Sequence, residues 1–261
     1  MLEDVRFVIV GAGGLGCPAL LGLRAAGARR LTVIDHDLVE LSNLQRQVLY
    51  GVPDLGVAKV DAARWAAGAS ASREDFVGWR ARLDPSDPQR LRAQLRAAAA
   101  GEPSPNTANQ PVAEAIASER AVVLECSDSP ALKFAVHDAC LAAQLPVVIG
   151  GVIAWRGQAM AVDPRTTGAG GRACYRCLFE APPPRELAPA CATVGVIGAA
   201  AGAIGHLMAS LAVGLLDEAG DSPAGALHDL DLLTGRVRRL APEARDDCPG
   251  CKAATPQRRP S

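Results

Sequence analysis

A glycine-rich turn between an apolar strand and a helix is the feature that most constrains this chain. Residues 5–10 form a hydrophobic run, and a helical stretch is predicted from about residue 14 to residue 26. Four glycines lie at the junction: Gly11, Gly13, Gly14 and Gly16. The pattern G-x-G-x-x-G in this context lets the backbone approach a phosphate, and the helix N-terminus supplies N–H donors. We therefore expect an adenine-nucleotide site.

An acidic residue at the end of the next predicted strand supports this interpretation. Asp35 closes the strand at 30–34 and follows Gly16 by 19 residues. At that position a carboxylate can accept hydrogen bonds from ribose hydroxyls. The two features together do not choose between NAD, FAD and ATP.

The order of the remaining elements predicts an α/β fold. We expect a Rossmann-like, doubly wound, mostly parallel sheet with an antiparallel extension. Further strands are predicted at 74–83, 122–124 and 146–149, helices at 56–68, 90–100 and 130–143, and hairpins at 152–162 and 226–240. We expect one domain over 1–261, with a nucleotide-binding half (1–150), a second half (151–252) and a flexible tail (253–261).

The composition narrows the class of protein. With 49% hydrophobic residues the chain is not intrinsically disordered, and a net charge of −1 gives no basic surface for nucleic acid. The N-terminal apolar run leads into the glycines without the features of a signal peptide. We therefore predict a cytoplasmic protein, whose eight cysteines are better explained as metal ligands or nucleophiles than as disulfides. Cys17, Cys126 and Cys140 lie within apolar runs, and we expect them to be inert core thiols.

Two CxxC pairs predict a metal site. They are Cys174 with Cys177 and Cys248 with Cys251. Two such knuckles supply four thiolates for a closed, tetrahedral and therefore structural zinc site. Thioredoxin-type redox chemistry is the rival explanation for either pair alone, but neither pair has that sequence context.

The stretch Ala192–Leu216 contains no charged residue and is long enough to span a bilayer. Its glycines at 195, 198, 202 and 205 suit close helix packing. A single span would place the two cysteine pairs on opposite sides of the membrane, where they could not share one metal. We therefore expect a buried or dimer-interface helix, and no membrane partner.

Cations and a further acid favour ATP over the redox cofactors. Asn43 and Arg46 closely follow Asp35, Lys59 lies on the next helical stretch, and Asp128 ends a predicted parallel strand. Attack on the α-phosphorus of ATP builds negative charge that cations stabilise, and a carboxylate suits magnesium. Taken singly, Arg46 could form a surface ion pair, Lys59 could lie on a solvated helix face, and Asp128 could be a helix N-cap.

The strings VIVGAGGLG, VIDHDLVELSNLQRQ, GVAKVDAA and ECSDSP resemble the ThiF/MoeB/HesA adenylyltransferases, relatives of the ubiquitin-activating enzymes. The resemblance runs from Arg6 to Cys251. It implies that residues 1–261 form one adenylation domain, whose second half (151–252) serves carrier binding, zinc binding and dimerisation. It implies that Gly11, Gly13, Gly16 and Asp35 hold the adenosine and phosphates. It also implies that Asn43, Arg46 and Lys59 neutralise the polyphosphate and that Asp128 binds magnesium.

The resemblance implies an activity and partners. These are the ATP-dependent adenylation of the C-terminal Gly-Gly carboxylate of a ubiquitin-like sulfur carrier, a separate sulfur donor for later thiocarboxylate formation, and a homodimer. Cys191 stands before the apolar helix, where related enzymes can bond covalently to the activated carrier. A covalent role and a passive thiol both remain open for Cys191.

Two departures from the family pattern leave room for other functions. Relatives carry an N-terminal helical segment whose arginine reaches the neighbouring protomer's ATP, whereas only five residues precede Arg6 here. Three explanations are open: another cation substitutes for that arginine, the activity is weak, or the chain begins at a late start codon. Residues 101–111 form an insertion of unknown purpose. The rival functions are an inactive scaffold that binds a carrier or partner, and a NAD-dependent oxidoreductase.

Overall fold

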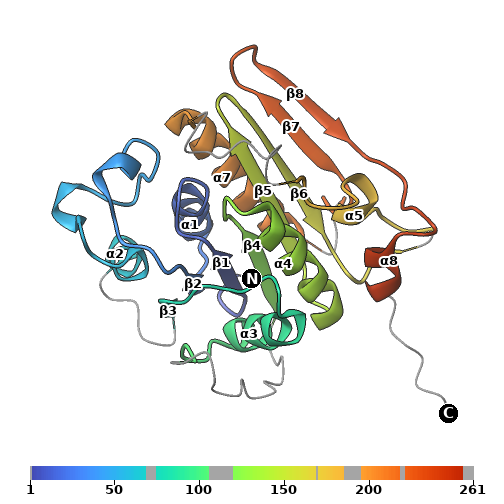
Figure 1. Ribbon diagram of the computed structural model, residues 1–261, viewed down its shortest axis with the longest axis horizontal. Coiled ribbons are helices and arrows are strands. Elements are labelled where there is room, and N and C mark those ends of the chain that lie inside the picture. Colours follow the sequence, from blue (N-terminus) through green and yellow to red (C-terminus); the bar gives the residue numbers. More distant parts are fainter. Residues whose placement is uncertain are drawn as a thin grey trace.

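A single eight-stranded sheet organises the protein (Figure 1). The computed structural model describes residues 2–68, 75–105, 120–168, 170–184, 195–217 and 221–254. The strand order is β3-β2-β1-β4-β5-β6-β7-β8. The strands are β1 (Arg6–Val10), β2 (Arg30–Ile34), β3 (Phe76–Trp79), β4 (Ala121–Glu125), β5 (Val147–Ile153), β6 (Arg156–Val162), β7 (Leu227–Asp231) and β8 (Arg236–Leu240).

The sheet has a parallel half and an antiparallel half. Strands β3, β2, β1, β4 and β5 pair in parallel, whereas β5 through β8 pair antiparallel. Parallel strands need helical crossovers, and the apolar runs of β1 and β4 are buried on both faces as such strands require. The predicted mostly parallel sheet with an antiparallel extension is confirmed.

Helices cover both faces of the sheet. They are α1 (Gly16–Ala25), α2 (Lys59–Ala66), α3 (Pro88–Ala100), α4 (Pro130–Ala143), α5 (Tyr175–Leu178), α7 (Gly198–Gly214) and α8 (Pro249–Ala254), with short 3-10 turns at Leu41–Asn43 and Val52–Asp54. One core cluster packs α1, α2 and α7 against the sheet, and a second packs α3, α4 and α8. Helices on both faces give the doubly wound arrangement that the sequence predicted.

One strand differs from the prediction. A strand at 146–149 and a separate hairpin strand at 152–154 were expected, but β5 runs unbroken from Val147 to Ile153 and turns into β6 through Ala154 and Trp155. Gly150 imitates a break in the sequence. In the structure Gly150 lies within the strand. A glycine is needed there because α7 crosses the strand at this point, and a Cβ at Gly150 would lie 2.1 Å from Met208 Sδ.

The apolar helix α7 packs against α1 and the sheet, and its middle is buried. None of the helices in the described ranges is both long and apolar enough to cross a membrane. The glycine at 205 makes close packing possible. A Cβ there would lie 2.4 Å from Pro18 Cγ and 2.6 Å from the carbonyl oxygen of Leu15.

Two glycines of α7 therefore provide a matched test of this packing. Gly205→Ala should lower the free energy of unfolding by about 1–3 kcal/mol, because the new methyl group overlaps atoms of α1. Gly202→Ala should raise it by up to about 1 kcal/mol, because a Cβ there meets nothing within 4 Å and alanine favours helix. Urea unfolding measures both. Equal stability of the two variants would contradict the packing.

Candidate functional site

The glycine turn follows β1 and leads into α1, and two of its glycines are required by close contacts. Gly11 has a φ of +91°, and a Cβ there would lie 3.1 Å from backbone atoms of Cys126 and Ser127. A Cβ on Gly16 would lie 2.0 Å from the carbonyl oxygen of Gly11. Because these two residues have no side chains, the end of β1, the start of α1 and the end of β4 can lie close together.

The carboxylate of Asp35 is buried at the end of β2 and holds this turn. Its Oδ2 accepts a 2.7 Å hydrogen bond from the Ala12 N–H, and its Oδ1 accepts a 2.8 Å bond from the Asp37 N–H. Each carboxylate oxygen has a second lone pair, so the group can still accept a ribose hydroxyl. Asp35 therefore connects the predicted ribose position to the turn that is predicted to bind phosphate.

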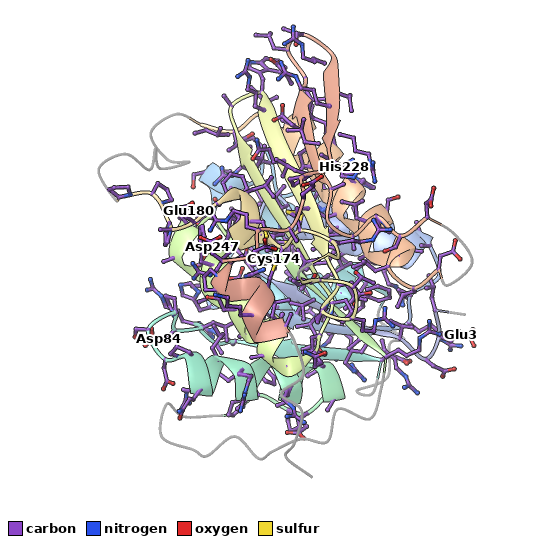
Figure 2. All side chains as sticks on the ribbon, turned by 90° about the vertical axis from the view of Figure 1, so that its right-hand side faces the viewer. Glu3, Asp84, Cys174, Glu180, His228 and Asp247 are labelled. Carbon is purple, nitrogen blue, oxygen red and sulfur yellow. The ribbon has the colours of Figure 1, made fainter. Side chains whose placement is uncertain are left out.

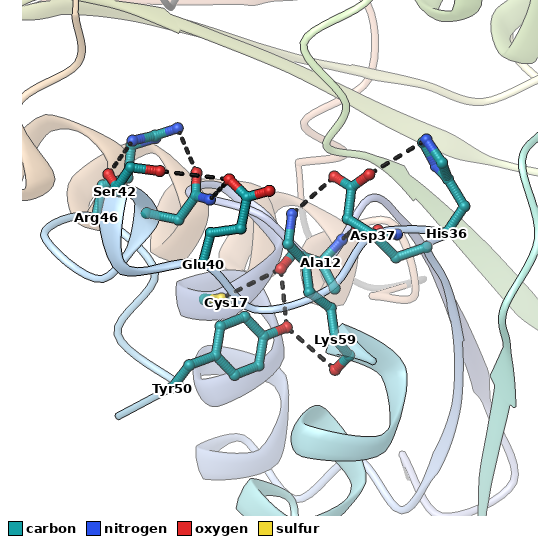
Figure 3. Close-up of polar contacts among 11 residues, drawn as sticks. Ala12, Cys17, His36, Asp37, Glu40, Ser42, Arg46, Tyr50 and Lys59 are labelled. Carbon is teal, nitrogen blue, oxygen red and sulfur yellow. Dashed lines mark hydrogen bonds and ion pairs between the residues drawn. The ribbon is translucent and has the colours of Figure 1, made fainter. Parts of the chain in front are cut away.

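Lys59 is held beside the turn by an acid that sequence analysis missed. Its Nζ lies 2.8 Å from Asp37 Oδ2, and the lysine side chain is only 6% exposed (Figure 3). Burial tends to raise the pKa of Asp37, but the hydrogen bond and charge of Lys59 outweigh it and hold the pKa below its usual value. Lys59 is thus a buried, positioned cation, and the interpretation as a solvated helix face is wrong.

Arg46 lies over the glycine turn from the opposite side. Its Cγ and Cδ would each be 3.5 Å from a Cβ on Gly14. The guanidinium donates 2.9 Å to Asn43 Oδ1 and 3.3 Å to the Ser42 carbonyl oxygen, and Asn43 donates to Glu40 (Figure 3). Within the described ranges Arg46 forms no ion pair with a carboxylate, so the surface ion pair considered for it is not found.

Gln47 completes this edge of the turn, although the sequence alone indicated no role for it. The residue is buried, and its Nε2 would be 3.8 Å from a Cβ on Gly13. Its Oε1 has no hydrogen-bond partner in the part of the chain that the structure describes. A buried amide without a full set of partners beside a phosphate-type turn is a feature that a ligand could satisfy.

The loop after β4 carries Asp128, which is exposed. It adjoins Ser127, whose backbone nitrogen is one of the close neighbours of Gly11. The N-cap of α4 is Ser129, whose Oγ accepts a 3.3 Å bond from the Leu132 N–H. Asp128 is therefore not the helix cap, and its carboxylate makes no hydrogen bond or ion pair with the described residues.

A buried ion pair holds this loop in place and was also missed from the sequence. Lys133 Nζ on α4 contacts Glu125 Oε2 at 2.7 Å, the Ser127 carbonyl oxygen at 2.5 Å and the Gly150 carbonyl oxygen at 2.6 Å. Ser127 donates to Glu125 through both its hydroxyl and its N–H. Burial raises the pKa of Glu125, whereas the bonds from Lys133 and Ser127 oppose that shift.

Three cysteines outside the CxxC pairs are buried, as expected for inert core thiols: Cys17, Cys126 and Cys140. Burial raises the pKa of the Cys17 thiol to about 12, so it stays protonated and unreactive at neutral pH. Cys191 lies outside the described residues, as does most of the 101–111 insertion. The role considered for Cys191 stays a prediction.

The four knuckle cysteines converge, as their spacing predicted. Their Sγ atoms all lie within 4.8 Å of one another, with Cys174–Cys248 at 3.5 Å, Cys177–Cys251 at 3.4 Å and Cys174–Cys177 at 3.9 Å. Four sulfurs about 2.3 Å from one zinc ion in a tetrahedron lie about 3.8 Å apart. The observed spacing fits such an ion, with these four residues as its ligands.

Ion pairs attach the cysteine cluster to its surroundings. Arg176, between the first two cysteines, makes a bidentate contact with Asp138 on α4, both bonds being 2.7 Å. Arg245, before the second pair, contacts Glu180 and Asp247; these two acids are labelled beside Cys174 in Figure 2. The cluster therefore joins the C-terminal segment to α4.

Comparison with known proteins decides the family. The profile of the ThiF family matches residues 1–250. This chain belongs to the ThiF family. It is 35% identical over 251 residues to "Adenylyltransferase and sulfurtransferase MOCS3" of Sus scrofa (96% of this chain, 49% of the relative). It is 33% identical over 261 residues to "Adenylyltransferase and sulfurtransferase uba4" of Aspergillus fumigatus (97% and 48%).

The ThiF-family chain thus spans about half the length of the curated relatives it matches. Solved structures of E. coli MccB share its fold. The complex with ATP superposes with a TM-score of 0.71 at 17% identity, covering 96% of this chain and 68% of MccB. The complex with MccA-N7isoASN gives a TM-score of 0.72, also at 17% identity, covering 96% and 67%. At this identity the likeness concerns the fold.

Metal analysis tests the cysteine cluster. We expect one zinc per chain by plasma mass spectrometry, and Cys251→Ser should lose it and lower the melting temperature by roughly 10 °C, because several kcal/mol of binding energy also stabilise the fold. Cys140→Ala, a buried thiol outside the cluster, is the control and should keep its zinc. A Cys251→Ser protein with full zinc content would rule out this ligand set.

Proposed function

We propose that this protein adenylates the C-terminal glycine carboxylate of a small ubiquitin-like sulfur-carrier protein and releases pyrophosphate. The observation that carries the proposal is the placement of two cations at one glycine turn. The stem of Arg46 packs over Gly14, and the buried amine of Lys59 is fixed by Asp37 near the end of β2. The names of the two curated relatives, both of which include adenylyltransferase, agree with this chemistry.

The residues suit catalysis by positioning and charge stabilisation. A carboxylate nucleophile is already ionised at neutral pH, so no general base is needed. Arg46 and Lys59 would neutralise the charge that builds on the phosphoryl oxygens, and Asn43 holds the Arg46 guanidinium through its 2.9 Å bond. Asp35 would hold the ribose, and the backbone from Gly11 to Gly16 would receive the phosphates.

Asp128 is the proposed magnesium ligand. Its exposed carboxylate is a hard oxygen ligand without a competing partner among the described residues, which fits this ion. Bound magnesium would neutralise phosphate charge. The chain's own contribution is the fixed loop: Lys133 holds the Ser127 carbonyl directly before Asp128.

The second half of the chain has the proposed supporting roles. Zinc at the four cysteines would be structural, since no coordination position stays open. The antiparallel half would bind the carrier, with its Gly-Gly tail directed to the nucleotide site. A separate protein would donate the sulfur for thiocarboxylate formation.

Carrier-dependent ATP–pyrophosphate exchange tests the activity. The wild-type protein should exchange label with a suitable carrier, and Arg46→Ala or Asp128→Ala should lower the rate about 10²- to 10³-fold, as losses of transition-state charge stabilisation do. Arg92→Ala, an exposed arginine on α3, is the control and should keep the wild-type rate. No exchange with any carrier would favour a scaffold, and full activity of Arg46→Ala would contradict the mechanism.

A homodimer is part of the proposal, supported by apolar residues at the surface. Large apolar side chains gather in the segment between β2 and α2: Leu38, Leu41, Val48, Val52 and Leu55. Leu41 is 69% and Val52 65% exposed. Several exposed apolar side chains within one short segment are typical of an interaction surface. Their proximity to Asn43 and Arg46 would place a dimer contact beside the nucleotide site, in addition to the contact predicted for residues 151–252.

Charged substitutions test this contact by light scattering coupled to gel filtration. Leu41→Asp and Val52→Asp should convert a dimer into a monomer, because a carboxylate buried at the contact loses its hydration. Val237→Asp on β8 introduces the same charge at an equally exposed apolar site and should leave the dimer intact. A monomeric wild-type protein, or a dimer that survives both changes, would refute this interface.

A further inference from the structure

Buried side chains hold both peptide groups that flank Ala12. The Ala12 N–H donates to Asp35, as described above, and the Ala12 carbonyl oxygen accepts a 2.9 Å hydrogen bond from the Tyr50 hydroxyl (Figure 3). The Cys17 thiol also contacts this carbonyl, at 3.5 Å. Backbone carbonyls in turns are commonly satisfied by water or neighbouring backbone, so two side-chain donors on one carbonyl are unusual.

The orientation of the Ala12 carbonyl fixes the next N–H. In a planar trans peptide the C=O of one residue and the N–H of the next point in opposite directions. The Tyr50 hydroxyl draws the Ala12 carbonyl toward the protein core. The Gly13 N–H therefore points the other way, away from Tyr50. No acceptor in the described part of the chain takes that N–H. It is free to donate to a phosphate oxygen at the turn.

Tyr50 also reaches the element that carries Lys59. Its hydroxyl lies 3.3 Å from the Lys59 carbonyl oxygen at the start of α2, and the tyrosine is 7% exposed. Burial raises the pKa of Tyr50 well above its usual value, so the hydroxyl keeps its proton and acts as a donor. One buried hydroxyl thus contacts both the glycine turn and the backbone of Lys59, the lysine proposed to bind phosphate.

We propose that Tyr50 is a positioning residue of the nucleotide site: it orients the Gly13 N–H toward the phosphates by holding the Ala12 carbonyl. This inference rests on the proposed binding of ATP at the turn, but not on the carrier or on turnover. Its action is specific to the phosphate end of the nucleotide. Removing the hydroxyl should weaken binding of phosphate-bearing ligands and leave the affinity for adenosine unchanged.

The test compares Tyr50→Phe with Thr32→Val. Each change removes one buried hydroxyl that donates to a backbone carbonyl; Thr32 bonds the Ala98 carbonyl oxygen at 2.9 Å between β2 and α3. Both variants should lose a similar amount of thermal stability. Tyr50→Phe alone should raise the Kd of a methylene-bridged, non-hydrolysable ATP analogue about three- to tenfold, the range expected when one donor is no longer held in place.

Adenosine provides the second readout, by displacement of a fluorescent ATP analogue. Its Kd should be the same for the wild type and Tyr50→Phe. Equal affinity of both proteins for the ATP analogue would overturn the inference, and so would an equal loss of adenosine and analogue binding. If Thr32→Val raised the Kd of the ATP analogue equally, the effect of Tyr50→Phe would come from lost stability, and the positioning role would be overturned. A wild-type protein that binds neither ligand would instead refute the nucleotide site itself.

Hydrogen exchange keeps the inference testable if Tyr50→Phe proves unstable. Without ligand, the peptide covering the glycine turn should exchange faster in Tyr50→Phe than in the wild type, because the variant lacks the hydroxyl that holds the Ala12 carbonyl. The corresponding peptide of Thr32→Val should match the wild type. Identical exchange of the turn in all three proteins would contradict the proposed hold on Ala12.

Discussion

The contact between Gly16 and the Gly11 carbonyl is the constraint on which the rest of the site depends. Because a Cβ at Gly16 would lie 2.0 Å from that oxygen, the helix can begin directly against the strand that precedes it. Gly11 in turn leaves room for Cys126 and Ser127 after β4, since a Cβ there would lie only 3.1 Å from their backbone atoms. A side chain at Gly16 would push α1 away from the end of β1, and one at Gly11 would push the residues just before Asp128 away from the turn.

Buried polar groups then specify the geometry around this contact. Asp35 and Tyr50 hold the two sides of the Ala12 peptide, and Lys133 holds the loop after β4 through three acceptors. Buried ion pairs contribute little net stability, because desolvation offsets their attraction, but a missing partner is costly. Such groups favour one arrangement over the alternatives. We therefore regard them as determinants of the position of the site more than of the free energy of unfolding.

Sequence patterns predicted those parts of the molecule that depend on local rules. The glycine motif, the apolar strands and the CxxC spacing each indicate structure within a few residues, and the parallel half and the cysteine cluster follow from them. The unbroken β5 could not be predicted, because Gly150 has the appearance of a break until α7 is known to cross it. The Lys59–Asp37 pair is equally hidden, since its partners are 22 residues apart.

The same limit applies to the groups beneath the turn. Tyr50 follows the polar segment without any pattern of its own, and its hydroxyl meets Ala12 only after the chain has returned across 38 residues. Glu125 gave a partial signal, as a carboxylate that closes an apolar strand must find a partner when buried. The identity of that partner, Lys133, depends on the angle at which α4 leaves the strand, which no local pattern encodes.

Helix α4 contacts both the proposed nucleotide site and the cysteine cluster. Its first turn carries Lys133, which binds the loop before Asp128 and the Gly150 carbonyl on β5. Five residues later, Asp138 receives the bidentate contact of Arg176 from the first cysteine pair. One helix therefore contacts both the loop that carries Asp128 and the segment that carries the first cysteine pair, and it fixes these two parts of the chain on one face of the sheet.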